Sequence, residues 1–144
     1  MNVLNIFSAC ALLLLTGACT SNKELKDAAQ TLNLDLDLAK SPYRYAIEED
    51  EKRLILVLRR MPVGQTAADA TLRADIERTI AKKLNELPKV VEVRIFETQP
   101  SYRREVWLVE KQGERLAFDI KINAARTRVD FTVAGPVVIE GELK

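Results

Sequence analysis

The sequence of 144 residues contains no histidine and only two cysteines, Cys10 and Cys19, both close to its N-terminus. Without histidine the chain has no Ser-His-Asp or Cys-His catalytic system, no histidine-based zinc site and no ordinary proton shuttle at neutral pH. The few serines after Cys19 lie in neither a nucleophile elbow nor a Ser-x-x-Lys pattern. Phosphate-binding glycine loops and spaced calcium ligands are also missing from the sequence. We therefore predict a protein that is not an enzyme and has no catalytic residue, metal site or cofactor.

Neither positive nor negative residues form a long block in the chain. The 22 Lys and Arg residues and 21 Asp and Glu residues give a formal net charge of +1 and are mixed along the sequence. A nucleic-acid-binding protein would be expected to carry a basic stripe, and a partner of basic proteins an acidic tail. We expect no nucleic-acid partner.

Long apolar runs are scarce, and the most prominent lies near the N-terminus, at residues 6–15. It has the length of a signal-peptide core and is shorter than the roughly 20 apolar residues needed to span a bilayer. Small residues and a cysteine follow it, in the order Leu15-Thr16-Gly17-Ala18-Cys19. This stretch resembles the signal peptide and lipobox of bacterial lipoproteins. An ordinary secretory signal or a buried N-terminal helix is the alternative interpretation.

The resemblance implies that residues 1–18 are a signal peptide and that Cys19 is the lipidated first residue of the mature chain. In that family the cysteine carries a diacylglycerol and its new amine is acylated, and two or more acyl chains hold a protein stably at a membrane. Asp after the cysteine marks inner-membrane retention in enterobacterial lipoproteins, and here Thr20 stands in its place. The expected location is the cell envelope, at the periplasmic face of the outer membrane.

Residues 19–40 are expected to form the lipidated N-terminus followed by a short helix or a tether. Ser21 and Glu24 have the spacing of a capping box, which predicts a helix that continues to about Gln30. Residues 32–39 fit either a helix or a strand, because leucines alternate there with other residues. A disordered tether is the alternative for the whole segment.

Residues 41–144 are expected to form a single domain. Apolar residues, which alternate with polar ones in most of these segments, predict strands at about 43–47, 53–60, 91–95, 102–110, 116–122 and 129–133, with a short edge continuation at 137–139. The first two strands flank the charged turn 49–52, which indicates a hairpin. The clearest helix is expected at about 67–87, with a possible cap at Thr66 and an apolar stripe formed by Leu72, Ile76, Ile80, Leu84 and Leu87.

This order of elements predicts an α+β fold. We expect an antiparallel sheet of about six strands with the long helix packed on one face, and a shorter N-terminal helix. Residues 54–58 and 106–109 are apolar at consecutive positions, so their strands are expected to be central in the sheet and buried on both faces. The segment 22–39 is the expected cover of the second face; the alternative is that a partner binds there.

One set of residues is a candidate partner-binding surface. Tyr102, Arg103 and Trp107 are of the types enriched at interface hot spots, and they lie together with Arg104 in one short stretch. The second face of the sheet adds Val109, Ile55 and Val57. The alternative interpretation is a structural strand with a buried Trp107 and a charged end.

Two functions are compatible with these features. In length, anchor and order of elements the chain faintly resembles the α/β class of secretin pilotins, small lipoproteins that carry secretin subunits to the outer membrane. That resemblance implies a non-enzymatic assembly or anchoring module with an envelope protein as partner and the lipid anchor in the membrane. The alternative is a ligand-binding or inhibitory periplasmic lipoprotein.

Overall fold

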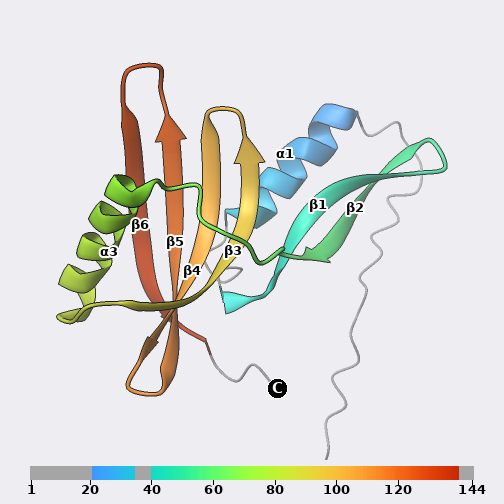
Figure 1. Cartoon of the computed structure of the whole chain (residues 1–144). Coiled ribbons are helices and arrows are strands. Elements are labelled where there is room, and N and C mark those ends of the chain that lie inside the picture. The colour runs from blue at the N-terminus through green and yellow to red at the C-terminus, as the bar shows by residue number, and fades with distance from the viewer. Residues whose placement is uncertain (1–20, 35–39, 140–144) are drawn as a thin grey trace, which may run out of the picture.

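A computed structural model describes residues 21–34 and 40–139 of the chain. In these residues the fold is α+β, with two helices and six antiparallel strands (Figure 1). The elements, in chain order, are α1 (Asn22–Asn33), β1 (Tyr43–Asp50), β2 (Arg53–Arg60), α3 (Ala70–Leu84), β3 (Lys89–Gln99), β4 (Tyr102–Lys111), β5 (Glu114–Ala124) and β6 (Val129–Val138). The predicted signal peptide and Cys19 lie outside the described residues.

The six strands form two sheets, which corrects the prediction of one. Strands β1 and β2 make a two-stranded hairpin, and β3, β4, β5 and β6 make a separate meander in that order. Each turn joins neighbouring antiparallel strands, as the short connections predicted. The error has a physical cause: five consecutive apolar residues in β2 suggested a central strand, but sequence pattern does not specify which strands pair across a long separation.

Helix α3 lies against one face of the four-stranded sheet (Figure 1). Its buried residues Ile76, Ile80 and Leu84 join a single apolar cluster with residues of β4 and β5. The strand members of this cluster are Trp107, Val109, Leu116, Phe118, Ile120 and Ile122. Burial of this apolar surface is the main favourable contribution to the stability of the sheet.

The ends of α3 differ from the prediction. The helix begins after Asp69, whose side chain accepts a hydrogen bond from the Leu72 amide at 2.8 Å, rather than after Thr66. It ends at Asn85, which adopts the left-handed conformation that commonly terminates helices. Leu87 therefore lies beyond the helix and is 90% exposed, so it is not part of the buried stripe.

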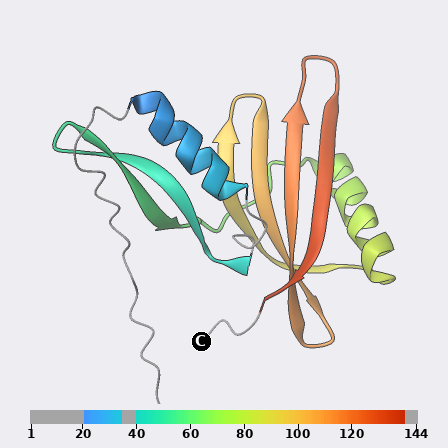
Figure 2. The same ribbon diagram turned by 180° about the vertical axis from the view of Figure 1, so that it is seen from behind.

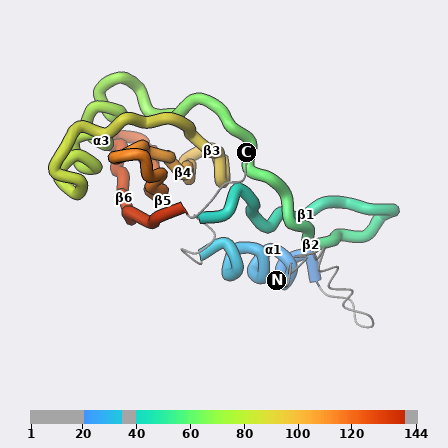
Figure 3. The backbone as a smooth tube through the Cα atoms, turned by 90° about the horizontal axis from the view of Figure 1, so that it is seen from below, coloured from blue at the N-terminus to red at the C-terminus, as the bar shows by residue number. Residues whose placement is uncertain are grey.

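Helix α1 packs on the β1–β2 hairpin. Its N-terminus has the predicted capping box, in which Ser21 Oγ accepts from the Glu24 amide at 3.2 Å and the Ser21 amide donates to Glu24 at 2.9 Å. The Asn33 side chain forms two 2.9 Å hydrogen bonds with the backbone of Tyr45 in β1. Viewed from below, α1 lies along the hairpin rather than across the four-stranded sheet (Figure 3).

The expectation that residues 22–39 cover the second face of one large sheet is therefore wrong for residues 22–34, and residues 35–39 lie outside the described residues. The second face of the meander has its own apolar cluster, which includes chain segments flanking the strands. Its buried members are Met61, Phe96, Val106, Leu108, Ala117 and Ile139. Seen from behind, this sheet and the α1–hairpin unit lie side by side (Figure 2).

Strand β6 continues through Gly135 and Pro136 as one strand, where two shorter segments were expected. The strand passes very close to β5 here: a Cβ atom on Gly135 would lie 2.8 Å from the Ala117 carbonyl oxygen. Gly135 also has a φ of +118°, which residues with a side chain rarely adopt. The glycine thus permits the pairing to continue past an irregularity between Ala117 and Asp119.

Candidate functional site

The structure distributes the candidate partner-binding residues over three environments. Trp107 and Val109 are buried in the cluster beneath α3, with 1% and 0% of their surface exposed. Ile55 and Val57 are half-buried residues of the hairpin. Tyr102 and Arg103 lie at the start of β4, where both are partly buried. The six residues therefore do not form one continuous surface.

A buried carboxylate lies on the side of β4 that faces α3. Glu105 is fully buried and accepts hydrogen bonds from the Trp107 indole and from the Ala67 amide, both at 2.7 Å. Arg103 forms an ion pair with Glu105 at 2.8 Å and donates to the Gln65 carbonyl oxygen at 2.8 Å. These bonds satisfy a charge that would otherwise be costly to bury, and they hold the loop before α3 on the sheet.

A second buried ion pair lies on the opposite side of β4. Arg104 and Asp119 form two parallel hydrogen bonds of 2.8 and 2.7 Å, and both side chains are at least 95% buried. The Arg104 guanidinium lies 4.2 Å from the centre of the Phe96 ring and also donates to the Asn33 carbonyl oxygen at the end of α1. Arg104 therefore links the meander to the α1–hairpin unit.

Tyr102 lies beside this ion pair at the beginning of β4. Partial burial raises the pKa of its phenol above the usual value, and the positive charge of Arg104 opposes that change. The phenol therefore stays protonated at neutral pH. The basic and aromatic stretch that suggested a binding surface thus consists largely of side chains with structural partners.

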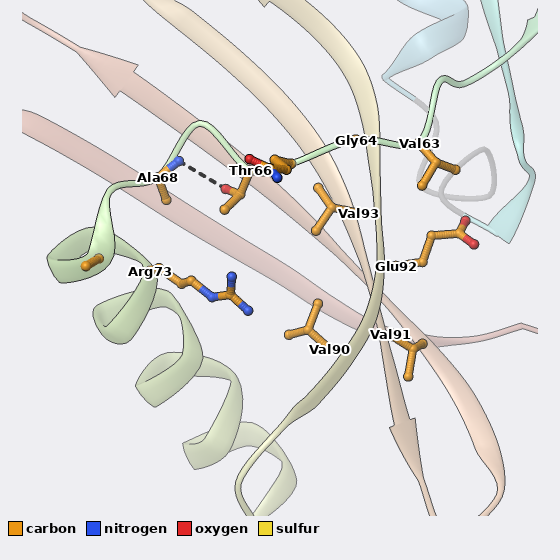
Figure 4. Close-up of a pocket in the computed structure, with 11 residues that line it drawn as sticks. Val63, Gly64, Thr66, Ala68, Arg73, Val90, Val91, Glu92 and Val93 are labelled. Carbon is orange, nitrogen blue, oxygen red and sulfur yellow. Dashed lines mark hydrogen bonds between the residues drawn. The ribbon is translucent and has the colours of Figure 1, made fainter.

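A cavity of about 620 Å³ lies between the loop 63–68, the first turns of α3 and the beginning of β3 (Figure 4). Valine and alanine side chains make much of its lining, together with Thr66, Arg73 and Glu92. Figure 4 shows Val90 and Val93 on the side of β3 that faces α3, and Arg73 extending from the helix toward them. Concave sites in which apolar side chains surround a few polar groups are typical of ligand sites, and this lining exposes polar and apolar surface in similar amounts.

Sequence reasoning did not find this cavity, because its walls come from three segments that are separate in the chain. In the sequence, residues 61–64 indicate only a loop, and Arg73 is one of several charged residues in the segment that predicts the long helix. One local signal was available: Val90 and Val91 are adjacent apolar residues, which interrupts the alternation of β3. The structure has a register shift between Val90 and Glu92 at this point.

The described residues contain no cluster of acidic or cysteine side chains arranged to hold a metal ion. Within the same residues, neither helix is sufficiently long and apolar to cross a membrane. No protein-family model, curated protein or solved structure matches the chain.

Proposed function

We propose that the protein is a lipoprotein attached through Cys19 to the periplasmic face of the outer membrane. There it acts as a non-enzymatic, pilotin-like assembly or anchoring module with an envelope protein as its partner. The observation that carries this proposal is the sequence Leu15-Thr16-Gly17-Ala18-Cys19 directly after an apolar segment of signal-peptide length.

The position of α1 supports an arrangement close to the membrane. Only Thr20 and Ser21 separate Cys19 from Asn22, the first residue of α1. Three extended residues reach about 10 Å. A lipid on Cys19 would therefore hold α1 and its hairpin close to the headgroups, so their position relative to the bilayer would be restricted.

The hairpin supports a protein partner. All five apolar residues of Leu54–Leu58 are partly or largely exposed, and Leu58 reaches 50%. Tyr43, on the neighbouring strand, is 41% exposed. Neighbouring apolar residues left open to solvent commonly mark interaction sites.

The cavity beside α3 favours a second candidate function, a ligand-binding or inhibitory lipoprotein. Its volume of about 620 Å³ is sufficient for a small organic molecule. This candidate shares the lipid anchor with the first and differs in the class of molecule bound.

Lipidation is tested by substituting the two cysteines separately. Cys19→Ala should abolish incorporation of a labelled fatty acid and leave an uncut or soluble precursor. Cys10→Ala is the matched control, because it changes the other cysteine within the same N-terminal segment and should be processed normally. If the Cys19→Ala chain still has the mature mass and remains in membranes, the anchor is not at Cys19.

The partner class is tested by crosslinking in intact envelopes. A stoichiometric membrane-protein partner supports the assembly module, whereas a bound small molecule or peptide supports the alternative. Leu58→Glu should reduce recovery of the protein partner if the hairpin binds it. Val129→Glu is the control, since Val129 is a similarly exposed apolar residue, at 51%, in β6. Equal recovery with both variants would exclude the hairpin as the contact surface.

A further inference from the structure

The cavity lies at an open edge of the four-stranded sheet. Strand β3 is the edge strand, and the loop 62–64 already pairs with part of its outer side. The Gly64 amide donates to Val93 at 3.0 Å, and the Ile95 amide donates to Pro62 at 2.8 Å. Beyond Gly64 the chain turns toward α3, and among the described residues no strand continues the pairing beside residues 89–92. Such an edge is a template for an added strand.

Valine side chains lie on both sides of this edge. Val90 and Val93 face α3, while Val91 and Glu92 lie on the other side of β3 (Figure 4). Val63 and Val91 are 61% and 40% exposed. An added strand would therefore find backbone groups at the edge and, for one of its side chains, a recess with valine side chains in its wall. Proteins bind extended peptides through this kind of arrangement.

The recess also contains a cation that can accept another anion. Arg73 Nε bonds Glu77 at 2.8 Å, and the described residues offer no hydrogen-bond partner to its two terminal nitrogens. The Arg73 side chain is 51% exposed and extends toward Val90 and Val93. Guanidinium groups bind carboxylates strongly because several N–H groups in one plane can donate together.

We propose that this cavity binds an extended segment of a partner protein. The segment pairs with the outer edge of β3 beside residues 89–92, places an apolar side chain between β3 and α3, and directs an acidic side chain to Arg73. That the segment belongs to an envelope protein rests on the proposed function. The chemistry of the site does not depend on the lipid anchor. The combination of an open backbone edge and a side-chain recess favours a polypeptide over a small molecule.

The probe is a library of short random peptides, displayed on phage and selected on the full chain purified from whole-cell extracts in mild detergent. We expect the recovered peptides to contain an acidic residue flanked by β-branched or other apolar residues. A synthetic peptide with the recovered sequence should bind at least about tenfold more weakly to Arg73→Gln, because a charge-assisted hydrogen bond is lost.

Glu77→Gln is the matched control. It removes the same surface ion pair but keeps the Arg73 cation, so binding should be unchanged or tighter. Replacing the acidic residue of the peptide by its amide should weaken binding to the unsubstituted chain and have little effect on Arg73→Gln. Equal binding of the acidic peptide to Arg73→Gln and to the unsubstituted chain would overturn the proposal.

Hydrogen exchange supplies a backbone readout. The bound peptide should slow exchange of amides in residues 89–93 more than exchange in β6, the other edge strand. Protection confined to β6 or to the hairpin, or no enriched peptide, would also overturn the proposed site. Mass measurement of the same preparation distinguishes the two proposals. A lipidated chain that binds no peptide would support the lipid anchor and overturn the peptide site. A chain without lipid that binds peptide would support the peptide site and overturn the anchor.

Discussion

The two halves of the molecule use apolar residues in different ways. In the meander with α3, long runs of residues in β4 and β5 are buried, and Trp107, Phe118 and Ile120 have at most 1% of their surface exposed. In the α1–hairpin unit, Ala29 is the only buried residue among the described residues 21–34 and 40–60. The hairpin sequence is nevertheless as apolar as that of a core strand, with Leu54–Leu58 uninterrupted.

This difference indicates separate roles for the two halves. A core of close-packed side chains stabilises the meander, whereas a two-stranded hairpin is marginally stable alone and depends on what packs against it. Helix α1 supplies part of that packing. A partner that covers the remaining apolar surface would stabilise the hairpin, as expected if the protein is the proposed assembly module.

The Arg104–Asp119 ion pair should give the largest effect, because it belongs to the buried half and also contacts α1. Asp119→Ala leaves a buried guanidinium without its carboxylate and should cost about 3–5 kcal/mol of unfolding free energy. Asp130→Ala is the control: its ion pair with Arg128 is largely exposed and should contribute less than about 1 kcal/mol. Denaturant unfolding measures both, and equal losses would contradict the structural role of the buried pair.

Truncation of one apolar side chain in each half tests the comparison directly. Ile76→Ala opens a cavity in the buried cluster and should cost about 2–5 kcal/mol. Leu56→Ala removes as many side-chain carbons from a residue that is only partly buried, so we expect a loss of about 1 kcal/mol. Thermal unfolding of both variants measures the difference. Similar melting temperatures would show that the hairpin contributes to the core as strongly as α3 does.

Sequence patterns predicted the elements better than their assembly. The strand over 116–122 has clear alternation, and the hairpin turn follows from the charges between two apolar segments. These signals are local, so a single stretch of chain contains them. The division into two sheets depends on which strands meet across long separations, and the run Leu54–Leu58 is compatible with a central strand as well as with the observed hairpin.

The polar groups inside the molecule were predicted least well. Asp119 lies between Phe118 and Ile120 in an alternating pattern that is typical of a solvated strand face, and Glu105 follows two arginines, but both carboxylates are buried. Each is compensated by residues that folding brings close: the Ala67 amide for Glu105, and Arg104 for Asp119. The cavity depends on the same kind of assembly, since Arg73 approaches Val90 only after α3 packs on the sheet.

A smaller effect is expected from Ser21, which tests whether the α1–hairpin unit opens on its own. Ser21→Ala removes the capping box and should destabilise α1 by about 1 kcal/mol. Thr31→Ala is the control, because it removes only a hydrogen bond to the carbonyl of Asp27 within the helix. Hydrogen exchange should accelerate in α1 and the hairpin of Ser21→Ala but not in β4 or β5. Acceleration throughout the chain would mean that the two halves unfold together.

The smallest predicted effect comes from the hairpin turn, where Glu51 and Lys52 have φ angles of 43° and 70°. Asp50 pairs with Arg53, so these residues form a two-residue connection in which both prefer other conformations. Replacing them with Asn and Gly should stabilise the hairpin by about 0.5–1 kcal/mol, since both new residues adopt positive φ readily.

The turn between β4 and β5 serves as the control for the substitutions at Glu51 and Lys52. Gln112 and Gly113 also have positive φ angles, and Lys111 pairs with Glu114 across them. Gln112→Asn should therefore stabilise the meander slightly and slow exchange in its core amides. The substitutions at Glu51 and Lys52 should instead slow exchange mainly in β1 and β2, with little change in the melting temperature of the core. If both turn variants shift the same global transition, the hairpin and the meander form one cooperative unit despite their different burial.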